Sequence, residues 1–329
     1  MSYLRVSKFG VVLGVSALSL FIVAPAAFSG AFQLWEEDTT GLASVHAGDA
    51  ASSDNAGSQF YNPASMTDFD HTVITSGGVA ILLDTQVNSG SSVTNDTGGQ
   101  TFPITEPVLG NTQNIVPNFA IVKPLSKRWS VGFSESTPFG ASTDYPDSDD
   151  LGTSDWAMAM YATETTIRTM NFNPNVAYAI SPKWSLGVGF DAMYGSIVYD
   201  SSALTNSLNG WGYGFNAGVL YKASEKWRFG LSYRSQVDVD TEGDSTADGL
   251  TTQGSIDLPL PATTMLSATE QMTSRWQMLY SVFYTQWDVV DVLQEDNSAV
   301  GTITVPQHYE NTWFLSIGGT YQLSDQWVL

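Results

Sequence analysis

The sequence predicts an all-β fold, a transmembrane antiparallel β-barrel. Three observations predict it: a polar turn repeated five times, segments around each turn that alternate between apolar and small polar residues, and basic residues gathered at these turns. Hairpins with short turns at one end and long polar loops at the other are typical of membrane-spanning barrels.

The repeated turn ends in a tryptophan, and these tryptophans recur every 43 to 55 positions. The five segments are Leu125–Trp129, Ile180–Trp184, Ala223–Trp227, Met272–Trp276 and Leu323–Trp327. Of the ten Lys and Arg that follow the first 29 residues, six lie in these turns: Lys127, Arg128, Lys183, Lys226, Arg228 and Arg275. The turns therefore mark one polar end of the hairpins.

The segment after Trp184 shows the alternation that a strand requires. Leu186, Val188 and Phe190 fall on one face, and Gly187 falls on the other. The apolar faces are about 10 residues long and begin and end with Trp or Tyr, as expected of tilted crossings with aromatic girdles. A secreted β-sandwich also alternates, but the girdles and the length favour the barrel.

The first 29 residues read as a signal peptide. Arg5 and Lys8 precede an apolar run at 9–23, and small residues follow, so cleavage is expected between positions 26 and 29. The alternative is an N-terminal anchor, which needs about 20 apolar residues. Export, together with strands that cross a membrane, predicts a location in the bacterial outer membrane.

The composition argues against several functions. The formal net charge of −21 disfavours nucleic acid, whose phosphates need basic partners. His46, His71 and His308 accompany no plausible Ser–Asp set, so we expect no enzyme, and also no metal site and no cofactor. The acidic runs at 144–150 and 238–248 are expected to be solvated loops; a divalent-cation site shared with lipopolysaccharide is the alternative.

Eleven strands are expected along the barrel domain, which spans residues 71–329. They run at 72–83, 115–125, from 129, 165–180, from 184, from 211, 227–238, 263–272, from 276, from 313 and from 327. An odd number would leave an open edge, which lipid does not accommodate. We therefore expect that the sequence is truncated and lacks C-terminal strands.

The stretch at 41–66 stands before the first strand. It is rich in small residues and contains no Lys or Arg, and it has too few large apolar residues to form a core of its own. We therefore expect the strands to build a container around it. Within it, Phe60 and Tyr61 are candidates to line an apolar path.

The third strand loses its pattern soon after Trp129. Glu135 falls on the face that would contact lipid, and Pro138, Phe139 and Gly140 follow. A charge facing lipid is costly, and proline cannot donate a ladder hydrogen bond. Two interpretations stay open: the strand has left the bilayer at this point, or it kinks and locally opens the wall.

The loop at 151–162 carries Trp156, Met158 and Met160 among acidic and polar residues. Exposed apolar side chains of this kind can form a groove for a hydrophobic ligand. Ordinary packing of the loop against the barrel rim is the alternative.

Several segments carry a family resemblance. They are Gly30–Glu36, Gly41-Leu42 through Asp49-Ala50-Ala51, Asp54–Gly57, Asn62–Ala64, Leu258–Pro261 and Tyr284–Asp288. Together they resemble the FadL family of outer-membrane channels for hydrophobic substrates. The resemblance implies a barrel of about 14 strands, of which about 11 are present here. It also implies that residues 30–70 form a hatch inside the barrel, with Asn62, Pro63 and Ala64 at its end.

The resemblance further implies uptake of long-chain fatty acids or other hydrophobic compounds, including aromatic hydrocarbons. The ligand would land in an external loop groove, enter an internal pocket and leave sideways at the third-strand break. Arg234, on the lumen face, is the candidate cation for a fatty carboxylate, and a structural pair with Asp49 or Asp54 is the alternative. Arg168 has the outward parity and is expected above the bilayer.

Two other functions stay open, a general porin-like diffusion channel and a structural or adhesin barrel. Lumen faces of Gly, Ser, Asn and Thr with few charges disfavour the porin. The expected partners are the hydrophobic ligand, outer-membrane lipid and lipopolysaccharide, and the chain is expected to act as a monomer.

Overall fold

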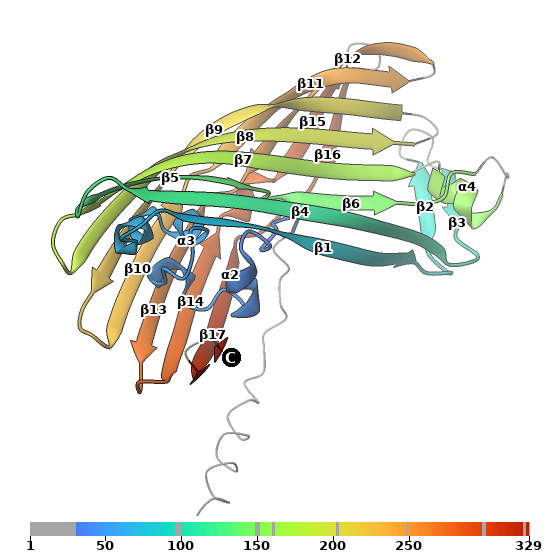
Figure 1. The fold of residues 1–329 in the computed structure, drawn as a ribbon. Helices are drawn as coiled ribbons and strands as arrows, with labels where there is room; N and C mark the ends of the chain where they lie inside the picture. The colour runs from blue at the N-terminus through green and yellow to red at the C-terminus, as the bar shows by residue number, and fades with distance from the viewer. Residues whose placement is uncertain are drawn as a thin grey trace, which may run out of the picture. The chain divides into compact units, whose positions relative to one another are not determined.

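The computed structural model describes residues 31–329, apart from 96–99, 149–151, 160–161, 202–203, 248, 298–300, 325–326 and 329. The predicted signal peptide and Met160 therefore lie outside the described residues. The described chain is dominated by one curved antiparallel sheet (Figure 1). No helix within it is both long enough and apolar enough to cross a membrane.

Short helical turns begin the described chain and recur in two loops. They are α2 (Thr39–Ala43), η2 (Asp49–Ala51), α3 (Ser58–Tyr61), η3 (Pro63–Asp68), α4 (Ser154–Ala159) and η4 (Trp287–Val289). Asp38 caps α2, because its carboxylate accepts from two backbone N–H groups of the first turn. Asn62 caps η3 through the N–H of Ala64. Residues 31–72 are called the N-terminal segment below.

The strands follow in chain order. They are β1 (Val73–Val87), β2 (Ser92–Asn95), β3 (Gln100–Pro103), β4 (Val108–Pro124), β5 (Trp129–Ser136), β6 (Gly140–Asp144), β7 (Glu164–Ala179), β8 (Trp184–Asp200), β9 (Leu204–Lys222), β10 (Trp227–Arg234), β11 (Val237–Ala247), β12 (Leu250–Leu260), β13 (Thr263–Gln271), β14 (Trp276–Thr285), β15 (Val292–Asn297), β16 (Gly301–Pro306), β17 (Thr312–Ser324) and β18 (Trp327–Val328).

Consecutive hairpins build the main sheet. Its neighbours run β1-β4-β5-β7-β8-β9-β10-β13-β14-β17-β18, and successive pairs along this path are antiparallel. Off this path, β6 pairs with β7, β11 with β9 and β12, β12 with β15, and β15 with β16. β2 and β3 form a separate hairpin.

One hydrogen bond explains the repeated turn. The backbone N–H groups of Trp129, Trp184, Trp227 and Trp276 each donate to the hydroxyl three residues earlier, over 3.0 to 3.2 Å. That hydroxyl belongs to Ser or Thr, and it satisfies a donor at the tip of the hairpin. The recurring pattern is therefore Ser/Thr-x-x-Trp, a turn in which each residue type has a structural reason.

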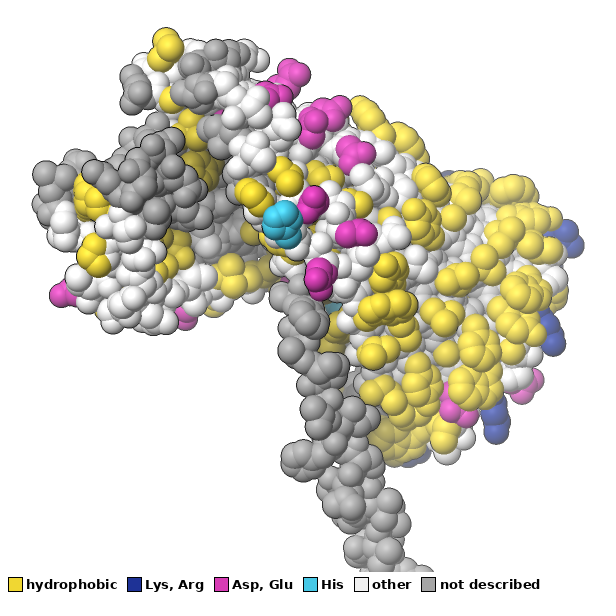
Figure 2. Space-filling model, turned by 180° about the vertical axis from the view of Figure 1, so that it is seen from behind, with side chains coloured by type: hydrophobic (Ala, Val, Ile, Leu, Met, Phe, Trp, Pro, Cys, Tyr) yellow, Lys and Arg dark blue, Asp and Glu magenta, His cyan; other side chains and the backbone are white. Residues whose placement is uncertain are grey.

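The strands next to these turns carry apolar outer faces, and this part of the sheet is called the turn-side half. In β10, Phe229 and Leu231 are 38% and 49% exposed, whereas Ser232 is buried. Figure 2 shows hydrophobic side chains over much of this surface, with the visible Lys and Arg gathered at one end of it. The pattern suits strands that contact lipid with one face.

Three neighbouring strands break at the same level. Arg234 at the end of β10 pairs with Thr263 at the start of β13, and Thr263 pairs with Thr285 at the end of β14. Beyond these residues the chain continues as β11, β12 and β15, which form the loop-side half of the sheet together with the adjoining ends of their neighbours.

The parity of the inward positions changes across two of these breaks, between β10 and β11 and between β12 and β13. Val237 and Val239 of β11 are 2% and 0% exposed, whereas Asp238 and Asp240 between and beside them are exposed. The last pairing of β10 with β9 joins Arg234 to Asn216, and the first pairing of β11 with β9 joins Asp240 to Trp211. Five residues lie between these pairings on the β10–β11 side and four on β9. One extra residue inverts a pattern of period two.

Several predicted boundaries are wrong in the loop-side half. β4 begins at Val108 and not at 115, and β9 begins at Leu204 and not at 211. The acidic stretch predicted as a loop at 238–248 is strand β11 as far as residue 247. The reason is the residue type, since the outer residues here are mostly polar and the strands no longer show a continuous apolar outer face.

Candidate functional site

The N-terminal segment docks on glycines of the sheet. Asn62 is fully buried, and its Nδ2 donates to the carbonyl of Val219 on β9 over 3.0 Å. A Cβ on Gly218 would collide with Asn62 Oδ1, and one on Gly187 would collide with the backbone of Ala64. These strands can hold the segment only because both positions lack a side chain.

Two further contacts attach the segment to separate parts of the sheet. The Asp68 carboxylate forms ion pairs with Lys222 on β9 and with Arg228 on β10, the latter over 2.6 Å. The amide of Gln59 donates to carbonyls of β4 and β5, each over 3.2 Å. The segment therefore bridges strands that are distant along the sheet.

Arg234 binds a carboxylate of the sheet. It forms an ion pair with Asp191 on β8, donates to the carbonyl of Phe60 over 2.9 Å and lies 4.3 Å from the centre of the Phe60 ring. The expected pairing with Asp49 or Asp54 is wrong, because Asp191 lies on the same inner face two strands away. Arg234 thus connects the wall to the N-terminal segment.

The break between β5 and β6 is bonded to the N-terminal segment. The N–H of Leu34 donates to the carbonyl of Pro138 over 2.9 Å, and the N–H of Gly140 donates to the carbonyl of Phe32 over 2.8 Å. Phe139 between them is 4% exposed. The residues that leave the sheet at the break therefore find their backbone partners in the first described residues of the chain.

A gap in the sheet lies beside this break. β4 pairs with β5 only from residue 119 onward, and within the described residues β6 forms a ladder with β7 alone. A cavity of about 1060 Å³ occupies this region. Its lining includes the outward-facing Ile115 and Met170, 78% and 36% exposed, as well as Ile167, which packs on a buried cluster. The cavity therefore reaches both faces of the sheet.

Glu135 lies close to the gap, at the end of β5. Its side chain is partly buried, and Oε1 has no hydrogen-bond partner among the described residues. Glu135 borders a small cavity of about 10 Å³ together with Glu37 and Asp38 of the N-terminal segment. The carboxylate with the lipid-facing parity thus lies against the N-terminal segment as well as the wall.

Glu37 is a buried carboxylic acid of the N-terminal segment. It is 5% exposed, and neither carboxyl oxygen makes a hydrogen bond to a described residue. Burial raises the pKa of Glu37 to about 8, and the nearby Ser136 hydroxyl and Arg234 guanidinium offset only part of that effect. The side chain is therefore mainly protonated at neutral pH.

A small apolar pocket lies between the N-terminal segment and the strands. Its volume is about 50 Å³. Its lining includes Phe60, Tyr61, Phe139, Met265, Phe283, Glu37 and Arg234. Most of these groups are apolar, and the cation among them, Arg234, is paired with Asp191. The pocket is much smaller than a typical ligand site, which measures about 300–1,000 Å³.

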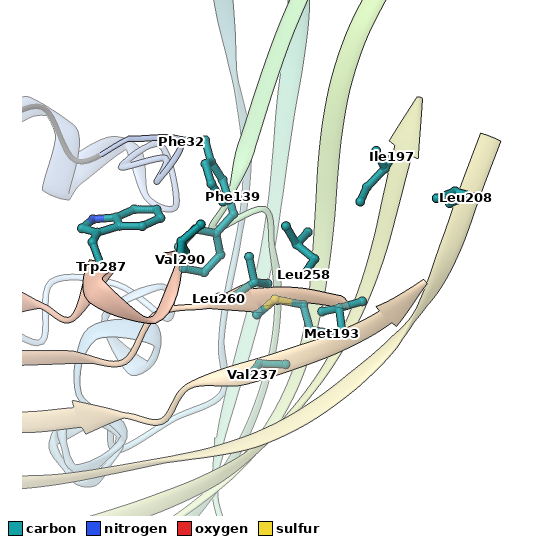
Figure 3. Close-up of a cluster of buried hydrophobic side chains, with 11 residues drawn as sticks. Phe32, Phe139, Met193, Ile197, Leu208, Val237, Leu258, Leu260, Trp287 and Val290 are labelled. Carbon is teal, nitrogen blue, oxygen red and sulfur yellow. The ribbon is translucent and has the colours of Figure 1, made fainter. Parts of the chain in front are cut away.

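An apolar cluster continues from this pocket into the loop-side half. Figure 3 shows Phe32 and Phe139 beside Trp287, with Val237 and Leu258 further along the strands. The Trp287 ring lies 5.1 Å from the Phe32 ring and 6.0 Å from the Phe139 ring, between centroids. The N-terminal segment, the break between β5 and β6, and the inner faces of β11 and β12 therefore contribute to one hydrophobic cluster.

The external apolar loop is largely packed against its neighbours. The Trp156 ring meets the Phe102 ring edge-on at 4.9 Å, and Met158 is 4% exposed in a cluster with Ile104. Trp156 remains partly exposed. Of the three predicted groove residues, Trp156 and Met158 lie together in this loop, and Met160 lies outside the described residues.

The acidic outer face of the loop-side half does not gather around a metal position. Asp238 and Asp240 point outward at successive positions of β11. In the part of the chain that the structure describes, no three side chains of His, Cys, Asp and Glu are grouped so as to hold a metal ion.

Sequence reasoning missed Phe32, Leu34, Glu37, Val237 and Trp287. Phe32 and Leu34 alternate with a polar residue, which is a strand-like signal too short to recognise alone. Val237 alternates with acidic residues, a pattern that indicates an apolar inner face once the strand is known. Trp287 lies in the segment Tyr284–Asp288 that carries the family resemblance, but its burial could not be predicted because it depends on which strands surround it. No sequence signal identifies Glu37.

The chain matches a family model described as outer membrane protein transport protein (OMPP1/FadL/TodX) over residues 20–329. A long-chain fatty acid transport protein of Escherichia coli O6:H1 is 27% identical, covering 95% of this chain and 78% of its own. Outer membrane protein P1 of Haemophilus influenzae is 28% identical, with the same two coverages.

Solved structures share the fold. A Pseudomonas aeruginosa FadL homologue superposes with a TM-score of 0.78 at 19% identity, over 90% of this chain and 79% of that one. The Ralstonia pickettii toluene transporter TbuX gives 0.65 at 14% identity, over 87% and 83%. The predicted fold class, a transmembrane antiparallel β-barrel, is confirmed.

Proposed function

The chain belongs to the OMPP1/FadL/TodX family of outer membrane transport proteins, and we propose that it takes up long-chain fatty acids. The protein resides in the bacterial outer membrane, and its class is transport of hydrophobic compounds. The choice of fatty acids over aromatic hydrocarbons is our proposal, and it is supported by the names of the curated relatives at about 27% identity.

The cavity between β4 and β6 carries this proposal. In the proposed path, the ligand lands on the loop cluster of Trp156 and Met158, enters the pocket beside Phe60 and Tyr61, and leaves through the gap into the bilayer. A lateral exit keeps apolar surface away from water throughout, which a water-filled pore would not do. The cavity's lining on both faces of the sheet supports the last step.

The N-terminal segment serves as the hatch in this proposal. Residues 31–70 would lie in the lumen, with Asn62, Pro63 and Ala64 fixing the end next to β1. Because Leu34 and Phe32 bond to the break, the incoming ligand would have to shift these two residues to enlarge the small pocket. The proposal also places a single chain in contact with lipid and lipopolysaccharide through the apolar outer face.

A reversible cross-link across the gap tests the exit. The protein has no cysteine, and the Thr112 hydroxyl donates to the carbonyl of Ser142 across the gap over 3.2 Å. Cysteines placed at Thr112 and Ser142 should therefore be joined by a short cross-linker that reacts with thiols and contains a reducible disulfide, which ties β4 to β6. We expect fatty-acid uptake by cells lacking other such channels to fall when the cross-link is formed and to recover when it is reduced.

The matched control ties two strands that are already paired. Thr246 and Thr251 face each other across β11 and β12 with hydroxyls 2.8 Å apart, so the corresponding double cysteine should leave uptake unchanged. Equal uptake with the gap cross-link formed and reduced would rule out lateral exit here. Passage of small sugars, with conductance that rises with salt, would favour the porin alternative.

A further inference from the structure

Arg168 lies at the gap between β4 and β6 and has no role in the path proposed above. Arg168 of β7 is exposed and pairs in register with Gly140, the first residue of β6. Its neighbour Thr169 faces inward, where its hydroxyl donates to the carbonyl of Phe139 over 2.7 Å. Alternation along the strand therefore directs Arg168 outward.

The guanidinium nevertheless reaches a residue of the inner face. Nη2 of Arg168 lies 3.5 Å from Oδ1 of Asn114 on β4. The Asn114 side chain also bonds to Thr112, and further along the same face Asn118 donates to the carbonyl of Glu36. Contact between an outward residue of β7 and an inward residue of β4 is possible only because no ladder closes the space between β4 and β6.

Arg168 keeps most of its hydrogen-bonding capacity. Arg228 and Arg234 form ion pairs with Asp68 and Asp191, whereas Arg168 forms no ion pair with a carboxylate of a described residue. A guanidinium has five N–H donors, and the single contact to Asn114 is long. The donors face a cavity lined largely by apolar side chains, including Leu34, Ile115 and Met170.

One acidic group lines the same cavity. Glu36 of the N-terminal segment is partly buried, and its carboxylate accepts from the N–H of Trp35 over 2.8 Å. Glu36 and Arg168 form no ion pair in the structure. The cavity therefore presents a cation that forms no ion pair with any described residue, and a separate carboxylate that already accepts a hydrogen bond.

We propose that Arg168 binds the carboxylate of an amphipathic substrate as its apolar chain passes through the gap. A planar guanidinium matches a carboxylate with two parallel hydrogen bonds, and the adjoining apolar side chains accept the hydrocarbon. Arg168 then makes the channel favour carboxylates over uncharged molecules of the same length. This inference rests on the proposed function, since it assigns the polar end of the substrate at the same exit.

The test compares two substrates that differ only in charge. Uptake of a long-chain fatty acid and of the primary alcohol of equal length is measured in cells with wild-type protein, Arg168→Gln and Arg168→Lys. We expect Arg168→Gln to reduce fatty-acid uptake about tenfold, because a hydrogen bond to a charged group is lost. Alcohol uptake should stay unchanged, and Arg168→Lys should retain part of the preference.

Arg275→Gln is the control for loss of a positive charge, because Arg275 lies in the turn before β14, away from the gap. It should leave both uptake rates at the wild-type level. Folding of each variant is checked by the gel mobility of unheated and heated samples. Equal losses for the acid and the alcohol, or no loss for either, would overturn the role of Arg168.

The two proposals fail in different ways. If wild-type protein takes up neither substrate, the proposed function fails, and the inference that rests on it is overturned with it. If wild-type protein takes up both substrates and Arg168→Gln does not change their ratio, only the inference fails. Reduced uptake of the fatty acid, with unchanged uptake of the alcohol, in Arg168→Gln supports both proposals.

Discussion

The turn-side and loop-side halves of the sheet differ in which face carries the large apolar residues. In the turn-side half, the outer face is Trp, Phe, Leu and Tyr, and the inner face is Gly, Asn and Ser, which lie against the N-terminal segment. In the loop-side half, the inner face carries Val237, Val239 and Leu258, and the outer face of β11 carries acidic residues.

This difference shows how a strand can pass from lipid to water without a change of direction. In the turn-side half, the outer face is apolar and suits contact with lipid, and the inner face lies against the N-terminal segment. Past the breaks, the outer face of β11 is acidic and suits contact with water, and the apolar residues are buried inside. Unbroken strands such as β9 make the exchange by residue type alone, with inward Gly and Asn in one half and inward Leu208 in the other. Between β10 and β11, one extra residue also changes which positions face inward.

Removing the indole of Trp287 should have the largest effect on this arrangement. Trp287 is 1% exposed within the inner apolar cluster. Trp287→Ala should lower the free energy of unfolding by about 3–5 kcal/mol, because lost contacts and a cavity both contribute. Urea unfolding in lipid vesicles measures it. Trp313→Ala, at a side chain 67% exposed on the outer face, should lose clearly less, and equal losses would contradict the contrast.

A charge placed on the two outer faces tests the contrast directly. Leu231→Arg in β10 should cost about 2–4 kcal/mol if the side chain meets the centre of the bilayer. Asp240→Arg in β11 should change stability by less than about 0.5 kcal/mol, since a surface change in water costs little. The same unfolding measurement applies to both. A loss at Asp240 as large as at Leu231 would show that both halves contact lipid.

A methyl group on the inner face of the turn-side half should loosen the N-terminal segment. In Gly218→Ala, the new Cβ collides with Asn62, and overpacking of this kind costs about 1–3 kcal/mol. Faster hydrogen exchange at 41–66 would report it; trypsin would not, because this stretch has no Lys or Arg. Gly78→Ala is the control, since its Cβ would lie 3.5 Å from the nearest atom.

Raising the pH should weaken the docking of the N-terminal segment gradually, over several pH units. Burial places the pKa of Glu37 at about 8 against an ordinary value of 4.5, so the docked state holds its proton more tightly than the released one. Docking is then strongest below about pH 4.5 and weakens by at most about tenfold per pH unit up to about pH 8. The mobility of a spin label at Thr39→Cys measures it. Glu37→Gln should make the dependence shallower without removing it, because burial also raises the pKa of Asp49 and of Asp54 in the same segment. An unchanged profile would contradict the assignment.

Much of the turn-side half could be read from the sequence, and much of the site could not. The Ser/Thr-x-x-Trp turns and the alternating strands are local patterns, so the hairpins were predictable. β11 was read as a loop because its apolar residues point inward between acids. The partner of Arg234 was mistaken because Asp191 is near only when β8, β9 and β10 are placed side by side.

The fold class, the hairpin repeat, the region of the third-strand break and the small-residue character of the N-terminal segment all follow from the order of the residues alone. Periodicity and turn chemistry involve only a few neighbouring residues, so they can be recognised without knowledge of the rest of the molecule. The folded molecule is needed to see that Phe32 and Leu34 bond to that break, that β4 and β6 leave a gap, and that Arg168 lies beside it. These are contacts between residues far apart in the chain, and they exist only when the sheet curves round the segment.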